Sequence, residues 1–268
     1  MKRLCSFILV IGFSFYPLIA LPMSVTFLEG TVELKTAASW TEINEGDRID
    51  SASSIRLSKD SFIEFVAGNR KIVLSSEGTY SLASVLTAPA GDKGKTNTVI
   101  NKFSKLMNKE APRSTAVAGV RGDFEGNPEE TLWVDDEEEA IDPEIPATEG
   151  RLLFDSNRFA EAAEKFGIAE KAAPEGEREL YSYSRAVAAA SAGDAITSIK
   201  VLRTMSPSGS LAIARAVLLA RLDLDTGAAR EAQQVLDDVS KRPDLTREDA
   251  ALIKEMKEEA SRALQNKL

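Results

Sequence analysis

The sequence predicts a two-domain protein of the β-then-α class. A small antiparallel β domain with one helix is joined by an acidic linker to an all-α helical solenoid. Three observations predict this order. Residues 24–86 alternate between apolar and polar side chains with the period of a half-buried strand. Every charged residue from Asp123 to Glu149 is acidic. From Gly150 onward the chain is rich in Ala, Leu, Glu, Arg and Lys, and its helical pattern repeats along the sequence.

The first 22 residues have the layout of a secretory signal peptide. Two cations precede an uncharged, mainly apolar run from Leu4 to Leu21, and small residues lie near Ala20. We therefore expect export with cleavage of residues 1–22, which leaves no stable membrane span. A retained membrane anchor is the alternative, because about 18 apolar residues is near the lower limit for crossing a bilayer. Pro17 and the lack of a cationic stop favour cleavage.

The composition excludes the commonest kinds of catalytic site. The 268 residues include no histidine, and the only cysteine, Cys5, lies in the export segment. Imidazole bases, imidazole metal ligands and Ser-His or Cys-His nucleophile pairs are therefore excluded. We predict a protein that is not an enzyme, with no catalytic residues, cofactor or metal site. A carboxylate pair that hydrolyses wall glycans is the alternative. The net charge of -9 argues against nucleic acid as a partner.

The β domain is predicted over residues 24–124. The apolar positions that mark its short strands are Val25 and Phe27, Val32 and Leu34, Ile55 and Leu57, Phe62 and Phe65, and Ile72 and Leu74. Turn residues such as Gly30 and Gly46 separate these short runs, which predicts one small antiparallel sheet with one solvent-exposed face.

One helix follows this sheet in the predicted β domain. It carries Val99, Phe103, Leu106 and Met107 on one face and ends before Pro112. The stretch "TAVAGVRGDF" then resumes the extended pattern and is interpreted as the closing strand.

The residues of this domain resemble the FecR-type domain of bacterial envelope proteins. The matching features are Trp40, the Gly46-Asp47 turn, Ser61 and the strand Val120-Arg121-Gly122, with Asp123 where the family usually has threonine. The resemblance implies a location in the periplasm or cell envelope and a wall or surface component as ligand. It also implies an alternative function as a periplasmic signal-transduction component, which would need a retained N-terminal helix.

Arg121-Gly122-Asp123 also spells the tripeptide that integrins recognise. The family resemblance accounts for Arg121 and Gly122 without adhesion, and the flanking apolar alternation indicates a strand rather than a loop tip. We therefore interpret the tripeptide as part of the closing strand, with an adhesive role as the alternative.

Residues 125–149 are predicted to be an acidic linker. A block of like charges repels itself and stays extended and solvated. Cation binding is the alternative, but the spacing of a calcium loop with its glycine does not occur here.

Residues 150–245 resemble tetratricopeptide (TPR) repeats. The first repeat carries Gly150, Phe159, Ala162, Phe166, Ala169 and Pro174 at the family's offsets. Ala162, Ser198 and Ala232 stand 36 and 34 residues apart, and the turns "AGD" and "TGA" separate the paired helices of the later repeats. Residues 246–268 then form a capping helix that begins with a Thr246 and Asp249 cap.

The TPR resemblance implies a concave groove, lined by the first helix of each repeat, that binds protein partners. The groove residues are predicted to be Arg151, Asp155, Tyr183, Arg221 and Asp225. The alternative is that Arg151 with Asp155, and Arg221 with Asp225, are ordinary ion pairs between side chains four residues apart. The predicted function is that of an exported, non-enzymatic envelope scaffold or adaptor.

Overall fold

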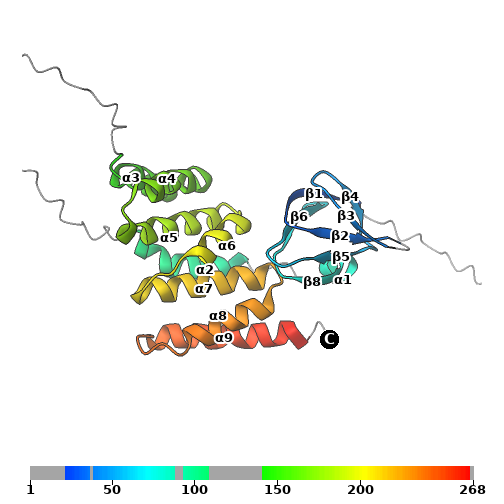
Figure 1. The fold of residues 1–268 in the computed structure, drawn as a ribbon. Helices are drawn as coiled ribbons and strands as arrows, with labels where there is room; N and C mark the ends of the chain where they lie inside the picture. Colours follow the sequence, from blue (N-terminus) through cyan, green and yellow to red (C-terminus); the bar gives the residue numbers. More distant parts are fainter. Residues whose placement is uncertain (1–21, 37–38, 88–92, 109–140, 266–268) are drawn as a thin grey trace, which may run out of the picture.

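The computed structural model describes residues 22–36, 39–87, 93–108 and 141–265. These residues form an N-terminal antiparallel β region followed by a C-terminal helical region (Figure 1), which confirms the predicted order. Residues 1–21 of the export segment, the acidic residues up to 140 and the Arg121-Gly122-Asp123 tripeptide lie outside the described residues. Their interpretations stay predictions.

The β region consists of two four-stranded antiparallel sheets, with the strand orders β4-β1-β6-β7 and β3-β2-β5-β8. The strands are β1 (Pro22–Glu29), β2 (Val32–Lys35), β3 (Trp40–Glu42), β4 (Arg48–Asp50), β5 (Ser54–Leu57), β6 (Phe62–Ala67), β7 (Arg70–Leu74) and β8 (Gly78–Ser81). A short helix, α1 (Leu82–Thr87), follows β8. The prediction of a single sheet with one exposed face is therefore wrong. The chain changes sheet five times, between β1 and β2, β3 and β4, β4 and β5, β5 and β6, and β7 and β8. The apolar faces of the two sheets pack on each other around Val25, Ile55 and Phe65.

Gly30 allows the first of these sheet changes. Its φ of +79 is a conformation that glycine adopts at no steric cost. A Cβ atom at this position would also clash with Oγ of Ser61, which accepts a hydrogen bond from the backbone N–H of Thr31 at 3.0 Å. Ser61 belongs to the features that resemble the FecR-type domain, and here it fixes the corner between the two sheets.

Two phenylalanines of the β region face the helices instead of the β core. A bulge in β1 between Val25 and Phe27 shifts the register against β6, which re-aims the side chains that follow it. Phe27 therefore packs against the core of the helical region, and Phe62, which is 4% exposed, belongs to that core. Phe62 and Phe65 are three residues apart, so a strand places them on opposite faces. Only Phe65 belongs to the β core, and the sequence could not show that another domain covers the face that carries Phe62.

The helical region is a stack of antiparallel helices (Figure 1). They are α3 (Glu144–Asp155), α4 (Phe159–Ala172), α5 (Glu175–Ser191), α6 (Ala195–Thr204), α7 (Gly209–Asp225), α8 (Ala229–Val239) and α9 (Arg247–Gln265). Ala162, Ser198 and Ala232 are all buried in it. The residues four and seven positions after each of them are buried as well: Phe166, Leu202 and Leu236; Ala169, Met205 and Val239. Gly193 and Gly227, with φ of +82 and +78, form the predicted turns. At the far end, Oγ1 of Thr246 accepts the predicted cap hydrogen bond from the N–H of Asp249 at 3.1 Å.

The predicted linker of residues 125–149 extends too far. Helix α3 begins at Glu144, inside that range, although Pro143 and Pro146 flank its start. Proline is tolerated there, because the first N–H groups of a helix have no intrahelical partner. Glu144 in the first turn suits the positive end of the helix dipole. The linker was bounded by the end of the acidic stretch at Glu149, whereas the helix begins earlier, at Glu144.

The predicted helix after the β strands belongs to the helical core, not to the β core. It consists of α2 (Lys93–Phe103) and the 3₁₀ turn η1 (Ser104–Asn108). Val99, Phe103 and Met107 are buried in the same cluster as α5 and α7, and Figure 1 shows α2 alongside α7. The helix and its apolar face were predicted correctly, but its assignment to the unit 24–124 followed chain order. An amphipathic helix does not specify its partner by its own period.

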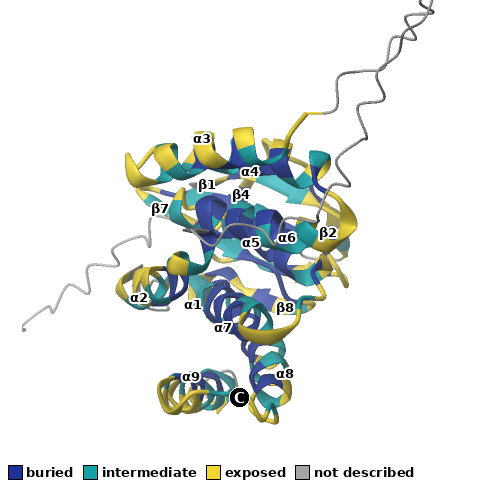
Figure 2. Cartoon of the chain, turned by 90° about the vertical axis from the view of Figure 1, so that its left-hand side faces the viewer, coloured by how far each residue is buried: buried dark blue, intermediate teal, exposed yellow. Residues whose placement is uncertain are grey.

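The β region is attached to the helical stack through polar and aromatic contacts. The hydroxyls of Ser75 and Thr226 are 2.8 Å apart, and Oγ of Ser76 donates to Oε1 of Glu231 at 2.6 Å. Lys200 pairs with Glu29, and its Nζ lies 5.6 Å from the centroids of the rings of both Phe27 and Phe62. Figure 2 shows that α7, in the middle of this arrangement, is buried along much of its length.

Candidate protein-binding face

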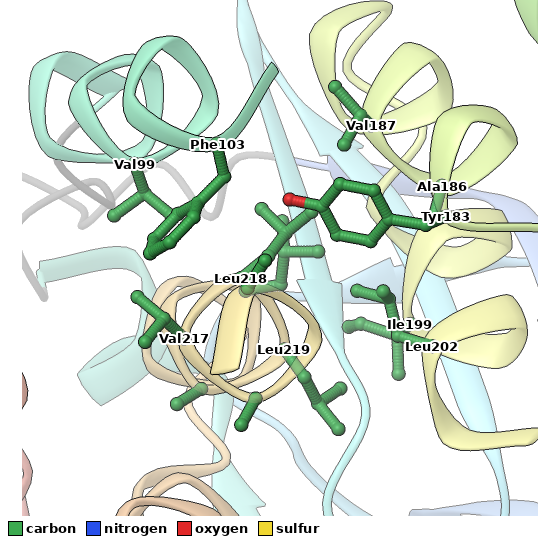
Figure 3. Close-up of a cluster of buried hydrophobic side chains, with 14 of the residues drawn as sticks. Val99, Phe103, Tyr183, Ala186, Val187, Ile199, Leu202, Val217, Leu218 and Leu219 are labelled. Atoms are coloured by element: carbon green, nitrogen blue, oxygen red, sulfur yellow. The ribbon is translucent and has the colours of Figure 1, made fainter. Parts of the chain in front are cut away.

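The predicted groove residues lead to a surface of the helical stack that α2 covers. We call it the α2-docking face and define it by Tyr183 of α5, Val217, Arg221 and Asp225 of α7, and Glu259 of α9. Figure 3 shows Val99 and Phe103 of α2 directed toward α7, where Val217 and Leu218 lie. The apolar stripe of α2 is therefore buried against α7, whereas its polar side chains reach toward α9.

A partly buried ion cluster, with Arg221 at its centre, joins α2, α7 and α9 at one end of this face. Arg221, only 2% exposed, donates from Nε to Oδ1 of Asp225 at 3.1 Å and from Nη2 to Oε1 of Glu259 at 3.0 Å. Lys95 of α2 donates to Oε2 of the same Glu259 at 2.8 Å, and the hydroxyl of Thr96 donates to Asp225. The two carboxylates are thus shared between the guanidinium of α7 and the side chains of α2.

Burial and charge act in opposite directions on this cluster. Burial tends to lower the pKa of Arg221, but its hydrogen bonds with Glu259 and Asp225 outweigh that effect and raise it. Burial likewise tends to raise the pKa of Glu259, and the hydrogen bonds from Arg221 and Lys95 reverse the shift and lower it. For Asp225 burial prevails, and its pKa is raised despite Arg221. Of the two acids, Glu259 is the better compensated.

A second ion pair holds the other end of α2. Lys102 Nζ lies 2.8 Å from Oδ1 of Asp249 at the start of α9. Burial tends to raise the pKa of Asp249, but its hydrogen bonds with Lys102 and Thr246 outweigh it and lower the pKa. Lys95 and Lys102 are seven residues apart, so α2 presents both cations to the acidic side of α9.

The structure brings together three of the five predicted groove residues and covers them. Tyr183 is fully buried, Arg221 and Asp225 form the predicted pair, and all three lie beneath α2. Arg151 pairs with Glu144 instead of Asp155, and Asp155 is exposed. The prediction of an open groove presenting all five side chains is therefore wrong. The chain's own helix fills the place where a partner was expected.

Sequence reasoning missed the residues of α2 and α9 that complete this face: Lys95, Thr96, Lys102, Asp249 and Glu259. A signal was present, because residues 93–108 contain no acid and place two lysines beside the apolar stripe. That pattern is typical of an amphipathic helix that docks in an acidic-rimmed groove. This pattern was not connected with α9, because Lys95 and Glu259 are 164 residues apart in the chain.

Replacing Tyr183 by phenylalanine should raise the free energy of unfolding by about 1 kcal/mol. The Tyr183 hydroxyl is buried and has no hydrogen-bond partner among the described residues, and this burial raises its pKa. In Figure 3 the hydroxyl points toward the space between α2 and α7. Urea unfolding followed by circular dichroism measures the change.

Tyr181 provides the matched control for this substitution. It is also buried, but its hydroxyl donates to Oε2 of Glu144 at 3.1 Å. Tyr181→Phe should therefore lower the free energy of unfolding by about 1 kcal/mol. Equal effects of the two substitutions would contradict the assignment of an unpaired Tyr183 hydroxyl.

Stability should depend on pH through Asp223, which is 1% exposed. Burial raises the pKa of Asp223 to about 7 from 3.8, only partly opposed by Arg203 at 3.2 Å and by Arg215, with Glu231 adding to the rise. The folded state therefore favours the neutral acid. The stability that Asp223 contributes is fully present below pH 3.8 and is lost as pH rises through about 7.

The difference between the wild-type chain and Asp223→Asn isolates this effect from other acids. The free energy of unfolding of the variant minus that of wild type should increase by roughly 2–4 kcal/mol as pH rises from 4 to 8. Denaturant unfolding at several pH values measures the difference, and parallel curves would show that Asp223 is ionised at no cost. Arg203 reaches solvent, so the variant does not leave a buried cation.

The described residues provide no evident catalytic arrangement. A hollow of about 450 Å³ lies beside η1 and the starts of α7 and α9, lined by Lys102, Leu106, Ile213, Asp244 and Glu248 among others. It contains solvated charges and aliphatic side chains. Among the described residues, no three His, Cys, Asp or Glu side chains are grouped closely enough to hold a metal ion.

We found no match to the chain among protein-family models, curated proteins or solved structures. Within the described ranges, none of the helices has the length and apolar character needed to cross a bilayer. The resemblances to the FecR-type domain and to TPR repeats therefore rest on the residues quoted for them.

Proposed function

We propose that the protein is an exported, non-enzymatic scaffold or adaptor of the bacterial envelope that binds protein partners through its TPR-like helical stack. One observation carries the proposal. The stack holds an amphipathic helix, α2, against α5 and α7, the first helices of two predicted repeats, and it does so with an apolar strip and an acidic rim. The FecR-like β region, attached to α6 and α8, would then position the stack near a wall or surface component.

Crosslinking in intact cells tests the binding of a partner. Proteins attached to residues 141–265 are identified by mass spectrometry, and recovery of the same protein in independent experiments is the expected result. A chain crosslinked only to itself, or only through the β region, would contradict a scaffold that works through its helices.

The native N-terminus tests export. Mass spectrometry should find that the mature chain begins near residue 22, consistent with the predicted signal peptide. An intact Met1 would contradict cleavage and would favour the alternative of a retained anchor, on which the signal-transduction function depends.

A further inference from the structure

We propose that α2 and η1 occupy a binding site for a partner's helix, and that the α2-docking face binds a basic amphipathic helix of another protein in their place. This inference rests on the proposed function and names the chemical class of the partner. The partner helix would carry two cations seven residues apart, with apolar residues on the same face four and eight positions after the first cation. Lys95, Lys102, Val99 and Phe103 have this spacing in α2.

Charge complementarity between α2 and α9 identifies this class of ligand. Residues 93–108 contain lysines and no acid. They face Glu248, Asp249, Glu255 and Glu259 of α9 through ion pairs of 2.8 to 3.9 Å. An acidic or neutral helix would remove the lysine partner of Asp249 and would leave Glu259 with Arg221 alone. The face therefore selects for positive charge as well as for an apolar stripe.

The sequence of α2 indicates that the face holds it in helical form. Gly94, Asn97, Thr98, Val99 and Ile100 are weak helix formers, and the acids that favour the start of a helix are missing from its first turn. An isolated segment of this length is marginal even with good helix formers. The folded state of α2 therefore depends on contacts that another helix can also make.

The fit of α2 is incomplete at the centre of the face. The Tyr183 hydroxyl, fully buried and aimed at the space between α2 and α7, has no partner among the described residues. Most buried polar side-chain atoms have a hydrogen-bond partner, so α2 leaves one polar group of the face unsatisfied in the described part of the chain. A partner helix with a polar side chain opposite the Tyr183 hydroxyl would form a hydrogen bond with it and so compete with α2.

The competition can be measured with a fluorescent peptide of residues 93–108 added to the purified full chain. Lys95→Glu with Lys102→Glu in the chain places like charges opposite Glu259 and Asp249 and weakens the docking of α2. Anisotropy should then show peptide binding about tenfold tighter than for the unmodified chain, because the face is open in more molecules. The same peptide with both lysines changed to glutamate should not bind.

Lys105→Glu is the matched control, since Lys105 is an exposed lysine of η1. It should leave peptide affinity unchanged. Peptide binding that is no tighter for the double variant than for Lys105→Glu would overturn the proposal. Release of α2 accompanied by formation of a dimer would do so as well, because the occupant would then be a second copy of this chain.

Hydrogen exchange on the unmodified chain tests the same point if the double variant fails to fold. Amides of Val99 to Phe103 should exchange about a hundredfold faster than those of Val217 to Leu222, because α2 opens without unfolding α7. Exchange of both segments at one common rate would show that α2 is a permanent part of the core. If crosslinking in cells still captured a partner, the scaffold function would stand and this inference alone would fail.

Discussion

Replacing Arg221 by methionine should lower the free energy of unfolding by about 3–5 kcal/mol. The substitution retains the volume of the side chain but removes the cation shared by Asp225 and Glu259. Lys95 still compensates Glu259, whereas among the described residues Asp225 keeps only the hydroxyl of Thr96. A buried carboxylate without a cation either bears a large desolvation cost or takes up a proton. Urea unfolding at pH 7 measures the loss.

The control is a pair of the same type on the surface. Arg158 pairs with Glu161 three residues later, and both side chains are half exposed. Arg158→Met should change stability by less than about 1 kcal/mol, as is usual for exposed ion pairs. Similar small losses for both arginines would show that water reaches Asp225 and that the ion cluster is not buried in solution.

The double variant Arg221→Met with Asp225→Asn separates the lost pair from the orphaned charge. If most of the cost of Arg221→Met is the unpaired carboxylate, neutralising Asp225 should recover about half of it or more. If the losses of the two single variants add in the double variant, the cost of Arg221→Met comes from changes in packing instead. The result also bears on the two interpretations of the groove arginines, because a side chain with such a structural role is not free to recognise a partner.

The sequence could predict the order of the elements and much of the packing between repeats. Spacings of 36 and 34 residues located Ala162, Ser198 and Ala232 at helix contacts, and all three are buried. Glycines at turns and the cap on α9 were likewise local features. Each of these depends on residues that are close in the chain or recur with a fixed period, so periodicity and turn chemistry are sufficient to find them.

The contacts between distant segments could not be predicted in the same way. Phe62 lies in a predicted strand, yet it belongs to the helical core, and Phe27 of β1 packs against the same core. Arg221 and Asp225 were identified as a pair, but Glu259 and Lys95, which make that pair an internal contact, come from other helices. Whether Arg221 and Asp225 are exposed depends on which distant segments of the chain pack over them. The predicted exposure of Arg221 and Asp225 in an open groove is therefore wrong, and the role of this surface in binding a partner stays a prediction.

Replacing Phe166 by alanine should lower the free energy of unfolding by about 3–5 kcal/mol. The ring is fully buried between α3, α4 and α5, where it fills the space that the small Gly150 leaves. A Cβ on Gly150 would lie 3.0 Å from Cε1 of this ring. Phe159, partly exposed and in edge contact with Phe154 at 5.0 Å between centroids, is the control. Phe159→Ala should cost less than half as much.

The contact between Gly150 and Phe166 predicts a reversal of sign. Alanine favours a helix over glycine by about 1 kcal/mol, but in the wild-type chain Gly150→Ala forces its methyl group against the ring and should destabilise by about 1–3 kcal/mol. In the Phe166→Ala background the ring is gone, and the same substitution should stabilise by about 1 kcal/mol. Urea unfolding of the four chains measures the coupling. If Gly150→Ala has the same effect in both backgrounds, α3 and α4 do not approach closely at this point, and the resemblance of this pair to a TPR repeat loses its physical basis.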